Sequence, residues 1–399
     1  MLTLNLHKVA ERRLNSGHCW VYSNEVDVAK TPLKSFSSGD LVEVIGARGN
    51  ILGSAYMEPN SLICARLYGF NEAIELDQAL VVDRLKSALS VREQFYSQPY
   101  YRLVFGDSDL LSGVVVDRYG DYLVLQLNNA GIERHQNAVI DALVSVIKPR
   151  GVLLRNDSRA RKEKNLSEQM ELVYGEVPAK VELIENGVKF LVPIHEGQKT
   201  GWFYDHRNSR ARLVDYVEGK RVLDVFSYIG AWGLQACAFG AKKVCCVDRS
   251  EAALEGVLEN AYLNHWQEQV DVIRGAADQV MASLYEQGRR FDVVIIDPPA
   301  FIQRKRDIKP GTRAYQKINH AALKLLDGQG TLISASCSMH LTMTGLKDVV
   351  NTAAAKEGYQ ARILEQGHQA MDHPIHTAIP ETEYIKTLFV GVGERVIKA

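Results

Sequence analysis

Hydrophobic and polar residues alternate in short runs over the first part of the chain. Strands are predicted at 40–45, 51–56 and 62–68, because alternation places one side chain in two on a buried face. A glycine-rich turn at 46–50 and a proline-containing breaker at 58–60 separate them. Many short strands with little helix predict a small β-barrel over residues 1–75.

The middle of the chain, residues 76–192, mixes two patterns. Apolar residues with helical spacing predict helices at 76–96 and 133–146. Strand-like runs occur at 101–105, 113–117, 121–127 and 151–155, and Asn186-Gly187 is the favoured two-residue turn for a hairpin over 181–192. We therefore expect a central α/β domain.

From residue 193 to 399 strands alternate regularly with helices. The predicted strands are 221–226, 243–248, 270–274, 292–297 and 330–336, and the predicted helices are 231–239, 251–264, 277–287 and 315–326. This alternation is typical of a doubly wound, Rossmann-like parallel sheet, so the fold class is α/β. Ligands of such sheets bind at the carboxyl ends of the strands.

Composition narrows the class of protein. The chain has 46% hydrophobic and 24% charged residues and a net charge of −1, which argues against binding nucleic acid by bulk charge. Two local basic segments, 148–164 and 304–313, are the exceptions. We find no apolar run long enough to cross a membrane and no signal-peptide pattern, and therefore expect a cytoplasmic protein without a membrane partner.

Neither cysteines nor histidines suggest a metal. The six cysteines have neither a zinc-site spacing nor a plausible disulfide framework. His373 and His376 have a metal-like spacing, but Pro374 breaks any helix that would align them. We therefore expect no metal.

Acidic residues end two of the predicted strands. The first strand leads into Asp224-Val-Phe-Ser-Tyr-Ile-Gly230, and the second ends in Asp248, where a carboxylate can accept hydrogen bonds from ribose hydroxyls. A dinucleotide site would need G-x-G-x-x-G, whereas Trp232 stands between the only glycines, and Asp224 would repel phosphates. The cationic cofactor S-adenosylmethionine suits these acids better, and Asp278 could close the adenine end.

The fourth and fifth strands end in residues that could perform covalent chemistry. Asp297-Pro298-Pro299-Ala300-Phe301 follows one, and Ser336-Cys337-Ser338 follows the next, so we expect Asp297 and Cys337 to be neighbours. A thiolate that adds to carbon 6 of a pyrimidine makes carbon 5 nucleophilic toward a methyl donor. Asp297 would stabilise the adduct at ring nitrogen 3. No residue is identified as the base that removes the carbon 5 proton.

Several further motifs carry a family resemblance. These are Gly17–Val26, Gly106–Gly113, Gly197-Gln-Lys-Thr-Gly-Trp-Phe-Tyr-Asp-His-Arg207 and Arg313-Ala-Tyr-Gln-Lys-Ile-Asn319. With the Asp297 and Cys337 motifs, they make the chain resemble, from end to end, the bacterial ribosomal RNA large-subunit cytosine-5 methyltransferases with an N-terminal PUA domain. Departures from the family pattern include Ile229, Ala231, Trp232, Trp202 and His206.

The resemblance implies a PUA domain at 1–75, a central domain at 76–192 and an S-adenosylmethionine-dependent methyltransferase domain at 193–399. It implies that the enzyme forms 5-methylcytosine in large-subunit (23S) ribosomal RNA, with Cys337 as the nucleophile. Residues expected at the cofactor are Asp224, Phe226, Tyr228, Gly230, Asp248, Asp278, Gln198, Lys199, Thr200 and Pro298. Residues expected at the RNA are Pro299, Phe301, Arg207, Arg155, Arg313 and Tyr315.

Three other functions remain open from the residues alone. The enzyme could methylate another base atom, such as a purine amino group, in which case Cys337 would be dispensable. The chain could also be a non-catalytic RNA-binding protein that uses the PUA domain. A nicotinamide-dependent oxidoreductase is the third.

Overall fold

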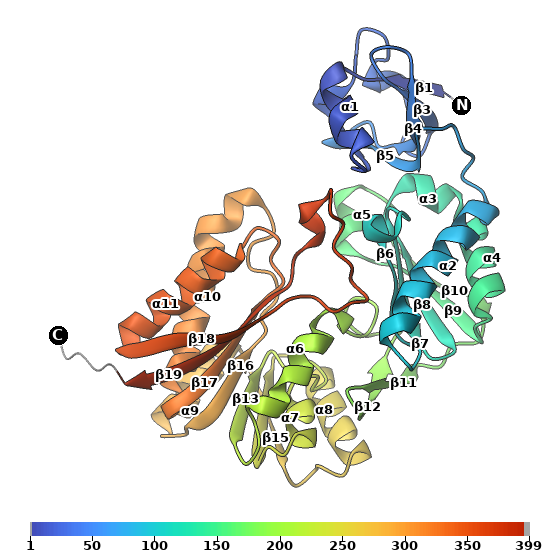
Figure 1. The fold of residues 1–399 in the computed structure, drawn as a ribbon. Helices are drawn as coiled ribbons and strands as arrows, with labels where there is room; N and C mark the ends of the chain where they lie inside the picture. The colour runs from blue at the N-terminus through green and yellow to red at the C-terminus, as the bar shows by residue number, and fades with distance from the viewer. Residues whose placement is uncertain (1, 395–399) are drawn as a thin grey trace. The chain divides into compact units, whose positions relative to one another are not determined.

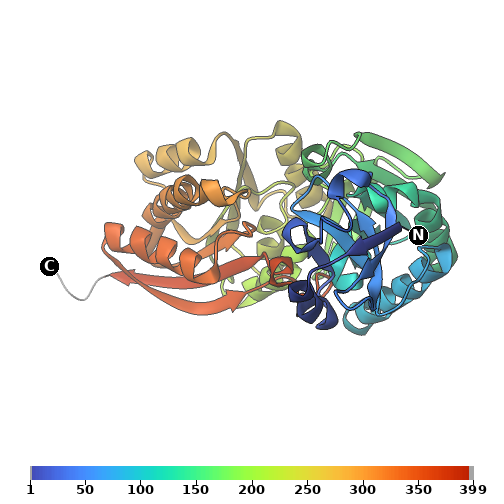
Figure 2. The same cartoon turned by 90° about the horizontal axis from the view of Figure 1, so that it is seen from above.

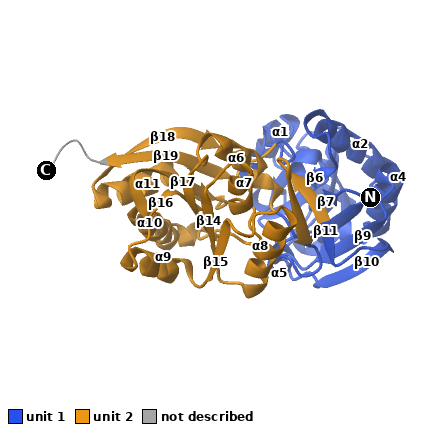
Figure 3. Ribbon diagram, turned by 90° about the horizontal axis from the view of Figure 1, so that it is seen from below, with its two compact units in different colours: residues 1–181, 193–202, 371–382 blue, residues 182–192, 203–370, 383–399 orange. Residues whose placement is uncertain are grey.

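The computed structural model describes residues 2–394 and forms two compact units (Figure 3). Unit 1 contains the residues up to 181 together with 193–202 and 371–382. Unit 2 contains 182–192, 203–370 and the residues from 383 onward. No helix within residues 2–394 is long and apolar enough to span a bilayer.

Unit 1 begins with a five-stranded sheet in the order β1-β3-β4-β5-β2. The predicted strands at 40–45, 51–56 and 62–68 are confirmed as an antiparallel meander. A short helix that we did not predict, α1, is amphipathic over only two turns and buries Ala10 and Leu14. The elements are β1 (Leu2–Asn5), α1 (Lys8–Asn15), β2 (Trp20–Tyr22), β3 (Leu41–Ile45), β4 (Ile51–Met57) and β5 (Ile63–Phe70).

A second five-stranded sheet, in the order β10-β9-β8-β7-β6, completes unit 1. Its core includes Val81 and Leu85 of α2, which begins after Asp77, whose side chain accepts a hydrogen bond from the Leu80 amide. The predicted helices and strands are confirmed, and β10 is an additional edge strand. The elements are α2 (Gln78–Phe95), β6 (Tyr100–Phe105), β7 (Val114–Tyr119), β8 (Tyr122–Leu127), α3 (Ala130–Arg134), α4 (Gln136–Ile147), β9 (Gly151–Asn156), α5 (Arg159–Glu163) and β10 (Gln169–Gly175).

Unit 2 is built on a seven-stranded sheet in the order β15-β14-β13-β16-β17-β19-β18. The first five strands are parallel, as predicted. Strand β19 runs antiparallel between β17 and β18, and β18 and β19, drawn in red tones in Figure 2, form one edge of the sheet. The strands are β13 (Arg221–Val225), β14 (Lys243–Asp248), β15 (Val270–Arg274), β16 (Phe291–Ile296), β17 (Leu326–Ser336), β18 (Tyr359–Gly367) and β19 (Lys386–Glu394).

Helices cover both faces of this sheet. Figure 1 shows α9, α10 and α11 on one face and α6, α7 and α8 on the other. The core under the first group joins Val294 and Ile296 of β16 to Ile318 and Leu323 of α10. The helices are α6 (Arg207–Ala211), α7 (Gly233–Ala238), α8 (Glu251–Leu263), α9 (Ala277–Glu286), α10 (Ile308–Lys324) and α11 (Met343–Glu357).

Two local predictions can be compared directly with the structure. The hairpin is confirmed as β11 (Lys180–Glu185) and β12 (Val188–Pro193), and both turn residues, Asn186 and Gly187, have positive φ. Helix α10 begins at Ile308, before the predicted Tyr315. Pro310 obscured this start, but it lies in the first helical turn, where no backbone donor is needed.

Candidate functional site

The loop after β13 has an unusual backbone. Phe226 and Tyr228 have φ of 67° and 49°, values that side chains with a Cβ rarely adopt, and Gly230 has φ of 90°. The loop is held because the Phe226 amide donates to the Val247 carbonyl at 2.9 Å. Such strain concentrates at ligand-binding loops, which favours a binding role for this turn.

The two predicted cofactor acids lie at the carboxyl ends of adjacent strands, β13 and β14. Asp224 is fully buried, and its Oδ2 accepts a hydrogen bond of 2.8 Å from the Gly233 amide. Asp248 is partly exposed, and its Oδ2 accepts a bond of 3.0 Å from the Tyr228 amide. Asp248 thus fixes the strained loop that Asp224 begins.

Burial gives Asp224 unusual protonation chemistry. It raises the pKa of this carboxyl group to about 7, and the nearby charges of Asp297 and Asp248 add to the shift. The Gly233 hydrogen bond opposes the shift but does not cancel it. The second oxygen, Oδ1, is buried without a hydrogen-bond partner among the described residues.

Asp297 and Cys337 lie at neighbouring strand ends. Strands β16 and β17 are parallel, with Ile296 opposite Ser334, so the residues that follow emerge at one edge of the sheet. The two loops are also joined directly, because the Ile302 amide donates to Ser338 Oγ at 3.2 Å. Cys337 is partly exposed, whereas the other five cysteines are buried.

A histidine and a tryptophan hold the two oxygens of Asp297. Trp232 Nε1 donates to Oδ2 at 3.0 Å, and His206 Nε2 lies 3.3 Å from Oδ1. Burial alone would raise the pKa of Asp297, but His206 and the hydrogen bond from Trp232 outweigh it, so the pKa lies below its usual value. Asp297 is therefore an oriented carboxylate. Neither His206 nor Trp232 is among the site residues that the sequence predicts, and both belong to the departures from the family pattern.

Tyr315 contacts the cysteine turn, the segment 336–338 that carries Cys337. It is completely buried, which contradicts its predicted place at the RNA. Its hydroxyl lies 2.9 Å from Ser336 Oγ and 2.8 Å from Ser338 Oγ, the residues on either side of Cys337. Because i, i+3 and i, i+4 spacing on α10 turns Tyr315 toward the sheet, it reaches the turn rather than the solvent.

Replacing Tyr315 with phenylalanine is expected to slow catalysis by about tenfold without changing cofactor affinity. The change leaves two buried serine hydroxyls short of a partner, which should also lower the free energy of unfolding by about 1–3 kcal/mol. Steady-state kinetics and urea unfolding measure the two effects. An unchanged kcat in a destabilised variant would show that the turn does not depend on this network.

Two predicted RNA-binding arginines are occupied inside the protein. Arg155 is buried, and its guanidinium donates to the Ile194 and Gly197 carbonyls at 2.9 and 3.1 Å and pairs with Asp157. The prediction that Arg155 contacts RNA is therefore wrong, because these acceptors leave its charge inside unit 1. Arg207 is also buried, and its Nε lies 3.4 Å from Glu185 Oε2 in unit 2.

The predicted cofactor residues 198–200 lie in unit 1. Thr200 is buried and its hydroxyl donates to the Asp117 carboxylate, while its carbonyl accepts a bond of 3.1 Å from Tyr119. Gln198 and Lys199 are exposed. Their roles at a cofactor stay predictions.

The remaining predicted residues lie around the carboxyl edge of the sheet in unit 2. Pro298 is buried, Pro299 is exposed, and the Phe301 ring packs 4.8 Å from that of Tyr315. Arg313 is exposed on α10. Asp278 is the second residue of α9 and pairs with Lys317 at 2.8 Å, which lowers its pKa. Their roles stay predictions.

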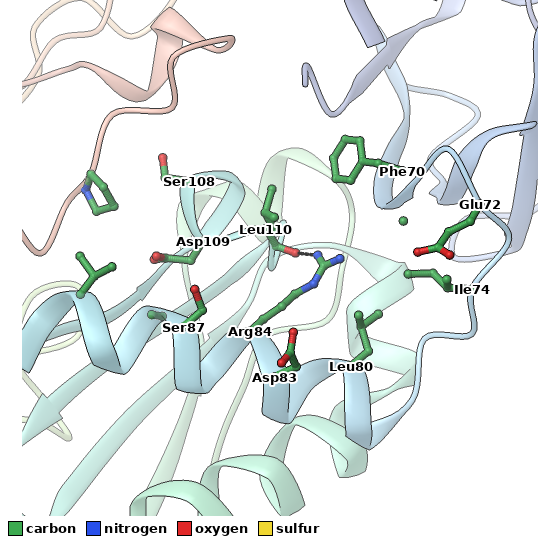
Figure 4. A pocket seen from close by; sticks show the side chains of 14 residues that line it. Phe70, Glu72, Ile74, Leu80, Asp83, Arg84, Ser87, Ser108, Asp109 and Leu110 are labelled. Carbon is green, nitrogen blue, oxygen red and sulfur yellow. Dashed lines mark hydrogen bonds between the residues drawn. The ribbon is translucent and has the colours of Figure 1, made fainter. Parts of the chain in front are cut away.

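Unit 1 contains a hollow of about 440 Å³ between β5, α2 and the turn Gly106–Asp109. Figure 4 shows Glu72 and Asp83 on its wall, and Arg84, whose guanidinium donates to the Leu110 carbonyl. None of the predicted site residues lines it. Within residues 2–394 no group of three or more His, Cys, Asp or Glu side chains is placed to hold a metal.

Comparison with protein families identifies two matching segments. Residues 4–70 match a family described as PUA-like domain. Residues 148–374 match a family described as S-adenosylmethionine-dependent methyltransferase. The second segment includes β13 to β17 and therefore the Asp224, Asp297 and Cys337 loops.

Individual proteins match over almost the whole chain. Ribosomal RNA large subunit methyltransferase I of Tolumonas auensis is 37% identical, over 97% of this chain and 98% of its own. The protein of that name from Vibrio vulnificus is 36% identical, over 96% and 97%. Among solved structures, SMU.776, assigned as a methyltransferase and complexed with SAH, superposes with a TM-score of 0.84 at 21% identity, covering 98% of this chain and 100% of its own.

Proposed function

The chain belongs to the S-adenosylmethionine-dependent methyltransferases, in the family of ribosomal RNA large subunit methyltransferase I, and we propose that it forms 5-methylcytosine in large-subunit (23S) ribosomal RNA. One observation carries the choice of target atom. The partly exposed Cys337 thiol and the oriented Asp297 carboxylate follow adjacent parallel strands. A thiol and a carboxylate at one edge suit covalent activation of a pyrimidine.

The residues around β13 and β14 fit S-adenosylmethionine. The buried Asp224 Oδ1 lacks a partner among the described residues, and a cationic ligand would supply one. A Cβ at Gly233 would come within 2.7 Å of Cys246 Sγ, so the backbone must pass closely here. We infer that Asp224 faces the cationic part of the cofactor and that Asp248 accepts from its ribose hydroxyls. When bound, the cofactor supplies the methyl group.

The chain's own residues then act on the base. Cys337 adds as thiolate to carbon 6 of cytosine, which places nucleophilic character on carbon 5. As the adduct forms, ring nitrogen 3 takes up a proton from solvent water, and the Asp297 carboxylate accepts the resulting N–H hydrogen bond. His206 and Trp232 keep that carboxylate in place. After methylation, the protons on carbon 5 and on ring nitrogen 3 pass to solvent water, and the sulfur leaves as thiolate.

The target nucleotide has to be single-stranded or flipped out, because a stacked base cannot reach Cys337. Exposed Pro299 and the partly buried Phe301 offer surface for the base, and Arg313 offers charge for phosphate. The PUA-like domain supplies a further RNA-binding module. Since bacterial ribosomal RNA is made in the cytoplasm, we place the reaction there.

The direct test is to map 5-methylcytosine in ribosomal RNA from cells with and without the gene. We expect one or more large-subunit cytosines to lose the mark and to regain it when the gene is restored. Purified protein with S-adenosylmethionine and unmodified large-subunit RNA should then reproduce it. Methylation at a purine in the purified reaction would overturn the choice of target atom.

Asp224→Asn is expected to remove a pH dependence of stability. The folded pKa of about 7 exceeds the usual 3.8, so the folded protein holds a proton that the unfolded chain has released. Stability of the cofactor-free protein therefore falls as pH rises from about 4 to about 7, by at most about 1.4 kcal/mol per pH unit from this group. Asparagine cannot ionise, so this slope should disappear in thermal melts taken across that range.

The same substitution should weaken cofactor affinity by about tenfold or more at pH 8, because a charged hydrogen-bond acceptor is lost. Calorimetry measures this effect. Asp271→Asn, which alters an exposed acid on β15, is the matched control and should change neither quantity. Unchanged affinity in Asp224→Asn would place the cationic group of the cofactor elsewhere.

A further inference from the structure

A buried lysine lies beside the cysteine turn. Lys386 is the first residue of β19 and pairs in register with Ser336 on β17, the residue before Cys337. Its side chain is buried, with 6% exposed. Its Nζ donates to the carbonyl of Ser338, the residue after Cys337, at 2.9 Å. The ammonium group is thus held against the backbone of the turn that presents the thiol.

Burial at this position disfavours the charged, ammonium form of Lys386 in free energy. Within residues 2–394, no carboxylate lies within ion-pair distance of Lys386 Nζ, and Ser338 is its hydrogen-bond acceptor. A buried charge without a partner is strongly unfavourable, and a neutral side chain could satisfy one carbonyl at lower cost. Burial lowers the pKa of Lys386 to about 8, while Cys337 and Glu383, the titratable groups that act on it, oppose that shift. An amine that is partly neutral near physiological pH can take up a proton.

Two other ionisable groups near the turn, Tyr315 and Asp297, have partners of their own. The Tyr315 hydroxyl is occupied by Ser336 and Ser338, and burial raises its pKa. Asp297 is held by His206 and Trp232, which keep it ionised. A carboxylate beside a thiol would also oppose thiolate formation, whereas an ammonium favours it.

We propose that Lys386 is a positioning residue that accepts the Cys337 thiol proton and holds the resulting thiolate as an ion pair. The step balances within the protein: the S–H bond breaks, an N–H bond forms, and a neutral thiol and amine become thiolate and ammonium. The role of that thiolate in methylation rests on the proposed function. The ion pair itself does not, because it forms before RNA or cofactor binds.

The test measures the reactivity of Cys337 in the free protein. The full chain is treated with iodoacetamide at a series of pH values, without RNA or cofactor, and the rate at Cys337 is followed by peptide mass spectrometry. In the wild-type protein we expect an apparent thiol pKa below the usual value of about 8.5. In Lys386→Met the pKa should rise by about one unit or more, so alkylation at pH 7 slows by about tenfold.

Two further variants separate charge from structure. Lys386→Arg keeps the positive charge and should preserve most of the fast alkylation, which a merely structural loss would not. Lys356→Met, which alters an exposed lysine on α11, is the matched control and should leave the profile unchanged. In RNA methylation, Lys386→Met should lower kcat at pH 7 and recover toward wild type at pH 9, where the thiol ionises unaided.

Two results would overturn the proposal. One is an alkylation profile of wild-type Cys337 that gives an ordinary thiol pKa. This measurement does not depend on whether any variant folds. The other is a folded Lys386→Met protein, checked by thermal melting, whose profile superimposes on the wild type. If the pKa of the Cys337 thiol is lowered and depends on Lys386, but the protein does not methylate large-subunit RNA, the proposed ion pair is supported and the proposed function is rejected.

Discussion

Replacing Cys337 with alanine is expected to abolish 5-methylcytosine formation while S-adenosylmethionine still binds. The thiol follows β17, one strand away from Asp297, and five other cysteines are buried and cannot substitute for it. Without sulfur addition at carbon 6, carbon 5 is too weak a nucleophile. We expect the rate to fall by at least about 10³-fold, a scale on which loss of a covalent nucleophile acts. Methyl transfer to large-subunit RNA and calorimetry of cofactor binding measure the two properties.

The matched control is Cys64→Ala in the N-terminal sheet. Cys64 is completely buried, so its loss creates a small cavity and costs about 1 kcal/mol of stability, but it has no part in the proposed chemistry. Full methylation by Cys64→Ala and none by Cys337→Ala would identify the nucleophile. Substantial turnover in folded Cys337→Ala would instead favour methylation of another base atom.

Asp297→Asn should produce the second largest loss. The carboxylate is held at both oxygens, and its pKa lies below the ordinary value, so it is negatively charged across the working pH range. Asparagine preserves the size of the side chain but not the charge that stabilises a protonated ring nitrogen. We expect kcat to fall by about 10²–10⁴-fold, the usual contribution of a positioned acid or base. Single-turnover kinetics with saturating cofactor report the chemical step.

Trp232→Phe is the graded comparison for this prediction. Phenylalanine keeps an aromatic ring in this buried position, so the fold should accept it, and the hydrogen bond to Asp297 Oδ2 is lost. A loss of one such bond to a charged group corresponds to about tenfold in rate. If Asp297→Asn were no slower than Trp232→Phe, the carboxylate would have no direct role at the base.

The sequence predicted the elements that repeat and the residues that end them. Strands β13 to β17 alternate with helices in a regular pattern, and four of them, β13, β14, β16 and β17, end near an acid or a thiol that a doubly wound sheet brings to one edge. Asp297 and Cys337 could be predicted to follow neighbouring strand ends because the alternation of strands and helices is enough to predict a parallel sheet. The end of the chain was harder to predict. Strand β18 has mostly exposed and half-buried residues, so it lacks a clear alternation.

The residues that the sequence could not reveal act through contacts distant in the chain. Arg155 lies in a basic segment, and only the fold brings the Ile194 and Gly197 carbonyls to its guanidinium. Tyr315 looks available for stacking until α10 turns it toward Ser336. Lys386 belongs to none of the sequence motifs, and only its register with Ser336 on β17 places it beside Cys337. The roles of these three residues depend on contacts with residues distant in the chain, which no local sequence pattern predicts.

The placement of β19 has a consequence for synthesis of the protein. Because β19 inserts between β17 and β18, the hydrogen-bonding edge of β17 stays open until translation has passed residue 386 and the growing chain has left the ribosomal exit tunnel. Lys386 and Cys337 therefore meet only after residue 386 has been synthesised and has emerged from the ribosome. A nascent chain released before that point would carry its cysteine without the neighbouring amine.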